Sequence, residues 1–196
     1  MTSPRAHPPR FVLMLAAGVV AWSSCTASHY HQVSCQVNRQ SIFLLEAQAV
    51  PSATLIPCVG QMPPGWSYGG SEVGSGFARF WLNSDRIGTH AVEATLTRSC
   101  DLSDTTEGHL AHAPTGLRLF EELAGSDQRG TVRHYVFDGG CVTYTFAFTQ
   151  RSMPTIFEEA DRFLGFTPRS IYVDGVREDE QFLPGDRRRS EHVVHQ

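Results

Sequence analysis

Apolar and polar side chains alternate along the middle of the chain, which is the period of a β-strand. Phe77–Leu82 forms one such run and Thr89–Arg98 a second, with a polar turn over Asn83–Gly88 between them. In the second run, His90, Val92, Ala94 and Leu96 fall on one face, and Ala91, Glu93, Thr95 and Thr97 fall on the other. This pattern predicts a β-hairpin with one face turned toward the core.

A second hairpin follows further along the chain. Thr131–Phe137 and Cys141–Phe148 are rich in β-branched and aromatic residues, and they flank Asp138-Gly139-Gly140. Glycines in such a short turn allow the positive φ that a tight hairpin needs. We also expect a strand over Leu117–Leu123, and a long acidic surface loop over Asp101–Pro114 because that stretch is small and polar.

Helical periodicity is clearest near the end of the chain, over Ser152–Gly165. Ser152 can cap this helix, Pro154 suits its first turn and Gly165 suits its end. The apolar stripe of this helix consists of Ile156, Phe157, Ala160, Phe163 and Leu164. Glu158 and Arg162 have the spacing of a helical ion pair. We expect the helix to cover one face of the sheet.

The remaining segments are shorter. Ser41–Ala49 contains good helix formers and ends before Pro51, so it predicts about two helical turns. Ala53–Cys58 predicts an extended or turn segment, and Ile171–Val173 a last short strand. In Met62–Trp66, consecutive prolines forbid a central strand, and we expect Trp66 to seal one end of the core within a glycine-rich loop.

Together these elements predict an α+β fold. It is an antiparallel, meander-like sheet of about five strands, with a C-terminal amphipathic helix packed on one face. We assign residues 1–27 to a leader, 28–40 to a linker, 41–176 to a single α+β domain and 177–196 to a polar tail. The tail contains Arg187–Arg189 among acidic residues, which is typical of a solvated segment that does not bind lipid head groups.

The leader has the composition of an export signal. Met1–Arg10 carries two arginines and no acid, and Phe11–Trp22 supplies twelve apolar residues. That run is short for a membrane span, which needs about 20 residues, but it suits the apolar core of a signal peptide. We therefore expect an extracytoplasmic protein.

Cys25 ends a stretch, Ala21-Trp22-Ser23-Ser24-Cys25, that resembles the lipobox of bacterial lipoproteins. The resemblance implies that Cys25 becomes the lipidated N-terminus. Trp22 departs from the pattern, which usually has Leu three residues before the cysteine. Two alternatives therefore remain open: cleavage near Ala27 with secretion, and retention of the leader as a signal anchor.

The other four cysteines form an even set in a chain expected to reach an oxidising compartment, so we expect two disulfides. Four cysteines allow three pairings. In an up-and-down meander, Cys100 and Cys141 lie at the same end of the sheet, which favours Cys100–Cys141 and leaves Cys35–Cys58. A zinc site is the rival interpretation, but the chain lacks the C-x-x-C pairs typical of zinc sites. We therefore predict no metal site.

Composition limits the function classes. The chain has 196 residues with 41% hydrophobic and 18% charged residues, so it can form a packed core and is not mainly disordered. Its formal net charge of −4 argues against general electrostatic binding of nucleic acid. We expect no cofactor.

Several polar motifs are candidates for catalysis, but each lacks the context that its chemistry needs. Gly65–Gly69 matches the G-x-S-x-G nucleophile elbow around Ser67, yet prolines precede it and glycines follow it, so the strand and helix of an elbow are missing. The remaining candidates are His29 and His31, His109 and His112, His134 as a third ligand or base, and Asn83, Ser84, Asp85, Arg86 and Asp101. We interpret them as loop and turn residues.

Five segments together carry a resemblance to a known group of proteins: Ala47–Val59, Pro64–Trp66, Asn83–Arg86, Leu96–Asp101 and Val136–Tyr144. With their prolines, tryptophan and cysteines they resemble an uncharacterised family of actinobacterial exported or membrane-anchored proteins. The resemblance covers about residues 40 to 166 and implies no catalytic activity.

The function that the sequence favours is therefore a binding or accessory module of the cell envelope, held at the membrane by its N-terminus. Its expected partners are an envelope protein or a small-molecule ligand. The alternative is a small extracytoplasmic hydrolase that uses loop Ser, His or Asp residues. A cleft that brings His134, His109 or Asp85 beside Ser84 would favour the hydrolase.

Overall fold

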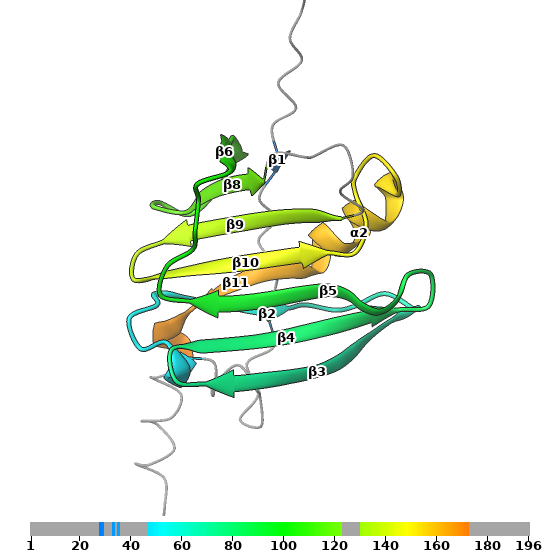
Figure 1. Cartoon of the computed structure of the whole chain (residues 1–196). Helices are drawn as coiled ribbons and strands as arrows, with labels where there is room; N and C mark the ends of the chain where they lie inside the picture. The colour runs from blue at the N-terminus through cyan, green and yellow to red at the C-terminus, as the bar shows by residue number, and fades with distance from the viewer. Residues whose placement is uncertain (1–27, 30–32, 34, 36–46, 123–129, 173–196) are drawn as a thin grey trace, which may run out of the picture.

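The structure is a computed structural model that describes residues 28–29, 33, 35, 47–122 and 130–172. Its main feature is a seven-stranded antiparallel sheet (Figure 1). In spatial order, the strands are β3 (Trp66–Gly74), β4 (Phe77–Ser84), β5 (Gly88–Thr97), β10 (Gly140–Phe146), β9 (Thr131–Phe137), β8 (Arg118–Glu122) and β6 (Thr105–Gly108). The expected leader at residues 1–27 and the tail at 177–196 lie outside the described residues.

Both predicted hairpins are present. β4 pairs with β5 and β9 pairs with β10, and Gly139 in the second turn has a φ of 71°. The predicted strand over Leu117–Leu123 is β8. Mostly antiparallel architecture is therefore confirmed, but the prediction of about five strands is wrong because both edge strands were missed.

The missed strands are polar or rich in glycine. β3 occupies the segment predicted as a glycine-rich loop, and β6 lies within the predicted acidic loop together with the two-residue β7 (Leu110–Ala111). Each of β3 and β6 pairs with the main sheet on one side only. Edge strands can carry such residues because one edge faces solvent, so the usual apolar signal of a strand is weak there.

The strand order differs from a meander at one place. β5 pairs directly with β10, although β6, β8 and β9 lie between them in sequence. The connection that follows β5, residues 98–104, therefore crosses β10, β9 and β8 to reach the far edge at β6. Figure 1 shows this crossover connection in front of the sheet. The face that it crosses is called here the outward face.

A second layer covers the opposite, inward face. It consists of α2 (Pro154–Phe163) and a two-stranded sheet of β2 (Leu55–Val59) and β11 (Leu164–Pro168), which Figure 1 shows behind the main sheet. β2 matches the extended segment predicted over Ala53–Cys58. The strand predicted over Ile171–Val173 is wrong: β11 lies earlier, and residues 169–172 are helical.

The C-terminal helix is present but begins and ends differently from the prediction. Met153 is the N-cap residue, and no side chain caps the helix, because the Ser152 hydroxyl bonds to Thr149. The helix ends at Phe163, two residues before Gly165, and β11 begins at the next residue, Leu164. Pro154 occupies the first turn as expected. Nη2 of Arg162 lies 3.9 Å from Oε2 of Glu158.

The core lies between these two layers. The alternating burial of β4 and β5 confirms that Val92, Ala94 and Leu96 face inward. The prediction that His90 shares this face is wrong, because His90 is exposed and stacks on Trp81. An aromatic cluster joins the layers: Phe166 of β11 contacts Tyr135 and Phe137 of β9 and Tyr144 of β10. Trp66 is 7% exposed and packs edge-on against Phe148 and Phe163, so it seals one end of the core as predicted.

Charged groups fasten α2 to two parts of the sheet. Arg133 of β9 is buried between Glu121 (Nε–Oε1 2.7 Å) and Asp161 (Nη1–Oδ1 3.0 Å), and its guanidinium lies over the Phe157 ring. Glu159 accepts hydrogen bonds from the Trp66 indole and from Arg86. The Arg86 hydrogen bond is the main reason that the pKa of Glu159 is lowered.

Near the N-terminus, Ser28–His29 forms β1, which runs parallel to β7. Residues 47–49 are helical and end before Pro51, and the rest of the helix expected over Ser41–Ala49 lies outside the described residues. Within the described residues, no helix is long and apolar enough to span a membrane.

Replacing Arg133 with Ala would leave the carboxylates of Glu121 and Asp161 without their shared cation. We expect a loss of about 3–5 kcal/mol in the free energy of unfolding, because removing one partner of a buried ion pair leaves uncompensated charge. The matched control is Arg118→Ala, whose pair with Glu107 is more than half exposed, so its loss should change the free energy of unfolding far less. Urea denaturation measures both, and equal losses would contradict this role of Arg133.

Gly139 and Gly76 form a second matched pair, since both have positive φ. A Cβ at Gly139 would lie 1.8 Å from the Ser52 carbonyl oxygen, whereas a Cβ at Gly76 would meet nothing within 4 Å. Gly76→Ala should therefore lower the free energy of unfolding only by the cost of holding an alanine in the left-handed region, about 1–2 kcal/mol. Gly139→Ala should cost clearly more, and thermal melting of the two variants tests the difference.

Candidate functional site

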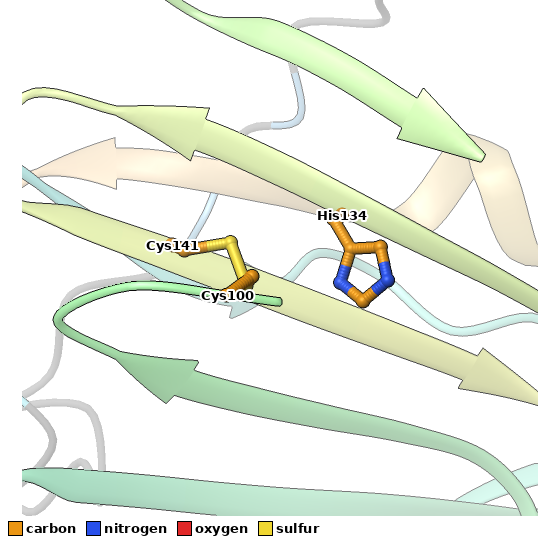
Figure 2. A group of neighbouring side chains, drawn as sticks. All are labelled: Cys100, His134 and Cys141. Atoms are coloured by element: carbon orange, nitrogen blue, oxygen red, sulfur yellow. A yellow bond between two sulfur atoms is a disulfide. The ribbon is translucent and has the colours of Figure 1, made fainter. Parts of the chain in front are cut away.

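The candidate site lies on the outward face, where the crossover connection leaves β5 and passes over the start of β10 (Figure 1). It consists of Cys100, Glu122, His134, Cys141 and Thr143, called here the disulfide–histidine cluster. Cys100 belongs to the crossover connection, Glu122 to β8, His134 to β9, and Cys141 and Thr143 to β10. Figure 2 shows the His134 ring beside the Cys100–Cys141 disulfide.

The register of the sheet brings these residues together. His134 of β9 lies directly opposite Thr143 of β10, and Cys141 lies two residues before Thr143 on the same face. Cys141 also pairs with Thr97 at the end of β5, three residues before Cys100. The chain leaving β5 therefore passes close to Cys141, and the Cα atoms of the two cysteines are 5.8 Å apart.

The Thr143 hydroxyl connects the imidazole to the disulfide. Its oxygen lies 2.9 Å from Nδ1 of His134 and 3.3 Å from Sγ of Cys100. On the other side of the ring, Nε2 of His134 lies 3.5 Å from Oε1 of Glu122. The ring thus has a hydroxyl next to one nitrogen and a carboxylate near the other.

His134 is 6% exposed, and its Nε2 atom is buried with no hydrogen-bond partner among the described residues. The Glu122 carboxylate is close enough for charge attraction but does not form a hydrogen bond in this arrangement. A buried imidazole nitrogen without a hydrogen bond costs free energy, because it has lost its contact with water.

Asp101 follows Cys100 in the crossover connection and is exposed. The backbone N–H of Ser103 donates to its carboxylate and is the main cause of its lowered pKa, and His134 adds a smaller electrostatic effect. Asp101 is thus a turn residue, as the sequence indicated, and it also lies in the electrostatic neighbourhood of the cluster.

In the disulfide form, the two sulfur atoms bond to each other and offer neither a nucleophilic thiolate nor a metal ligand. Both disulfides predicted from cysteine parity are present, as Cys35–Cys58 and Cys100–Cys141. Cys35–Cys58 fastens the N-terminal segment to β2. The meander topology predicted the Cys100–Cys141 pair, but the two cysteines meet because β5 pairs directly with β10.

A second group of outward side chains lies over β3, β4 and β5. The Trp81 ring stacks on the His90 ring with centroids 4.9 Å apart, and it lies so close to Gly70 that a Cβ there would collide with it. Arg79 beside them contacts Glu72 (Nε–Oε2 2.9 Å) and Glu93 (Nη1–Oε1 3.7 Å). These side chains are half-buried or exposed.

The Ser, Asp and His residues considered for hydrolysis do not converge. Ser67 lies within β3 opposite Asn83, so it is not on a strand-to-helix elbow. Ser84 is buried on the inward side of β4, and its hydroxyl accepts the Arg86 backbone N–H, whereas His134 faces outward. Asn83 accepts the His90 backbone N–H. Asn83 and Ser84 are thus the last residues of β4, and their side chains stabilise the turn over residues 85–87 that follows.

The paired histidines are also separate from the cluster's contacts. His29 lies in β1 opposite Ala111, and its sequence partner His31 lies outside the described residues. His109 and His112 flank β7 and are exposed. The H-x-x-H pair thus lies around a short strand, and the helical turn that would align both rings is absent from this described segment.

Sequence reasoning did not place His134 beside the cysteines, although a signal existed. Once the Asp138-Gly139 turn is recognised, pairing Phe137 with Gly140 places His134 opposite Thr143. That register alone predicts His134 and Cys141 on one face of the hairpin. Cys100 joins them through the β5–β10 pairing, which is a long-range contact.

Comparison with known proteins adds no relative. No family model, no curated protein and no solved structure matches this chain.

Removing the Cys100–Cys141 bridge should lower the free energy of unfolding. The bridge spans 41 residues, and the chain-entropy argument gives at most about 4 kcal/mol for a loop of this length. In Cys100→Ala/Cys141→Ala, hydrogen exchange should accelerate first in the crossover connection and β6, while the β3–β4 hairpin keeps its protection. Uniform acceleration across the sheet would show that the bridge does not act locally.

Proposed function

We propose that this chain is an extracytoplasmic domain, anchored at the membrane by its N-terminal segment, that acts as a binding or accessory module of the cell envelope. The observation that carries the proposal is the pair of disulfides. Cys58 and Cys141 are completely buried, and each bridge joins segments that are distant in sequence. Such structural bridges form and persist in oxidising compartments and are rare in the cytosol.

The N-terminal sequence supports the same location. A basic segment, a short apolar run and Cys25 follow one another in the order of a lipoprotein leader. A lipoprotein's diacyl anchor supplies the two signals that stable membrane attachment requires. The resemblance to exported actinobacterial proteins favours this interpretation as well.

A binding role is favoured over hydrolysis by the positions of the polar side chains. Ser84 and His134 lie on opposite faces of the sheet, and the Ser84 hydroxyl accepts a backbone hydrogen bond in its turn. Nucleophilic catalysis needs the nucleophile and its base within hydrogen-bond reach. We therefore assign the proposed binding role to the surface of the disulfide-bridged sheet.

The anchoring proposal predicts a defined mature form. Intact-mass measurement of the protein from an actinobacterial membrane fraction, unreduced and alkylated, should show a chain that begins at Cys25, carries acyl chains and has no alkylated thiol. Cys25→Ala should abolish the acyl mass and move the protein out of the membrane fraction, unless the leader is retained as an anchor. A chain with four alkylated thiols would contradict export.

The binding role is tested on the same membranes. Native mass spectrometry after mild detergent extraction should show the protein together with a partner of defined mass. Release of the protein only as a free single chain, at every detergent concentration that extracts it, would contradict a role as a binding module.

A further inference from the structure

Three donor groups of the disulfide–histidine cluster meet within a small volume. The sulfur atoms of Cys100 and Cys141 and a ring nitrogen of His134 all lie within 4.8 Å of one another (Figure 2). Two cysteines and a histidine are a ligand set that zinc prefers, and a catalytic zinc site uses three protein ligands and leaves one position open. In the described part of the chain, Cys35–Cys58 belongs to no such group.

We propose that opening the Cys100–Cys141 disulfide converts this cluster into a binding site for Zn²⁺, with Cys100, Cys141 and His134 as ligands. The disulfide form shown here is the metal-free form of the same site. This proposal goes beyond the envelope module proposed above and does not depend on it, because it concerns the chemistry of one cluster in either location.

The redox step is a thiol–disulfide exchange with a dithiol. The dithiol supplies two electrons and two protons, it becomes a disulfide, and the S–S bond between Cys100 and Cys141 becomes two thiols. Zn²⁺ then replaces the two thiol protons, which leave to solvent, and neutral His134 contributes a nitrogen lone pair. In the reverse exchange, an external disulfide accepts two electrons and two protons and becomes a dithiol, the S–S bond between Cys100 and Cys141 forms again, and the metal is released.

The geometry requires one sulfur to move. Two thiolates on a tetrahedral zinc with bonds of about 2.3 Å lie about 3.8 Å apart, farther than two bonded sulfurs. Cys141 is held in β10, with strand partners on both sides. Cys100 lies in the crossover connection outside the strands and is only partly buried. Cys100 is therefore the ligand that can shift while Cys141 and His134 keep their positions.

The surroundings of His134 match those of a metal-binding imidazole. The Thr143 hydroxyl lies within hydrogen-bond distance of both Nδ1 of His134 and Sγ of Cys100. Nδ1 is therefore the ring nitrogen that faces the sulfurs. Nε2 lies 3.5 Å from the Glu122 carboxylate and is buried without a hydrogen bond. Histidine ligands usually donate the N–H of their other nitrogen to a carboxylate or carbonyl, which sets the tautomer. A metal on Nδ1 would leave Nε2–H to donate to Glu122.

Protection from alkylation tests the site directly. The full chain is reduced with dithiothreitol, desalted under argon and incubated with or without Zn²⁺, and its thiols are then alkylated and mapped by peptide mass spectrometry. We expect zinc to slow alkylation of Cys100 and Cys141 at least tenfold, at one zinc per chain, and to leave Cys35 and Cys58 unaffected. The unreduced chain should bind no zinc at this site.

Variants separate ligation from general effects of reduction. His134→Ala should weaken zinc binding at least tenfold, and Glu122→Gln should weaken it tenfold or more, as changes to such supporting carboxylates do. His109→Ala is the matched control, because it removes an exposed histidine outside the cluster and should bind zinc like the parent chain.

Several results would overturn the proposal: no protection of Cys100 and Cys141, equal protection of all reduced cysteines, or the same zinc affinity in His134→Ala and the parent chain. Near-ultraviolet circular dichroism follows the fold in the same samples. If reduction unfolds the chain, zinc should restore the signal in the parent chain but not in His134→Ala. Equal behaviour of the two chains would again refute the site.

Discussion

The pairing of β5 with β10 is the contact on which the rest of the structure depends. It joins two antiparallel runs, β3–β4–β5 and β10–β9–β8–β6, into one sheet. Because β10 occupies the place beside β5, the chain between them must leave the sheet, cross three strands and return from the far edge. This crossing brings Cys100 onto Cys141 on the outward face. The Cys100–Cys141 bridge then holds the crossing segment in place.

The two faces of the sheet carry different chemistry, and β9 shows why. Arg133 and His134 are consecutive, so they project to opposite sides. Arg133 points inward, where Glu121, Asp161 and the Phe157 ring surround it and connect α2 to the sheet. His134 points outward, where Thr143, Glu122 and the disulfide surround it. The neighbouring glutamates of β8 divide in the same way, with Glu121 serving the inward group and Glu122 the outward one.

This division places the apolar core and the disulfide–histidine cluster on opposite faces of the sheet. The inward face is an aromatic and aliphatic core, closed by Trp66 at one end and by the β2–β11 layer elsewhere. The outward face holds the groups whose state depends on redox conditions: a partly buried sulfur in a connection, and an imidazole with one nitrogen unsatisfied. The Cys100–Cys141 bridge and the aromatic core therefore lie on opposite faces of the same sheet.

Local patterns in the sequence determined much of the architecture. Alternation identified β4 and β5, the Asp138-Gly139-Gly140 turn identified the β9–β10 hairpin, and helical periodicity identified α2, because in each case neighbouring residues specify the element. Cysteine parity indicated two disulfides. The polar edge strands β3 and β6 were not predicted, since a strand paired on one side does not need an apolar pattern. Likewise, β11 follows α2 without a turn signal, and its partner β2 lies about a hundred residues earlier.

The candidate site was determined only by the tertiary structure. The register of one hairpin was readable and places His134 opposite Thr143, but Cys100 reaches them through the β5–β10 contact, and Glu122 through the packing of β8 on β9. Such long-range pairings depend on which complete arrangement buries the apolar faces best, and this is a property of the whole chain. The sequence by itself therefore determined the elements and their chemistry, and the tertiary structure decided which of those chemical groups meet.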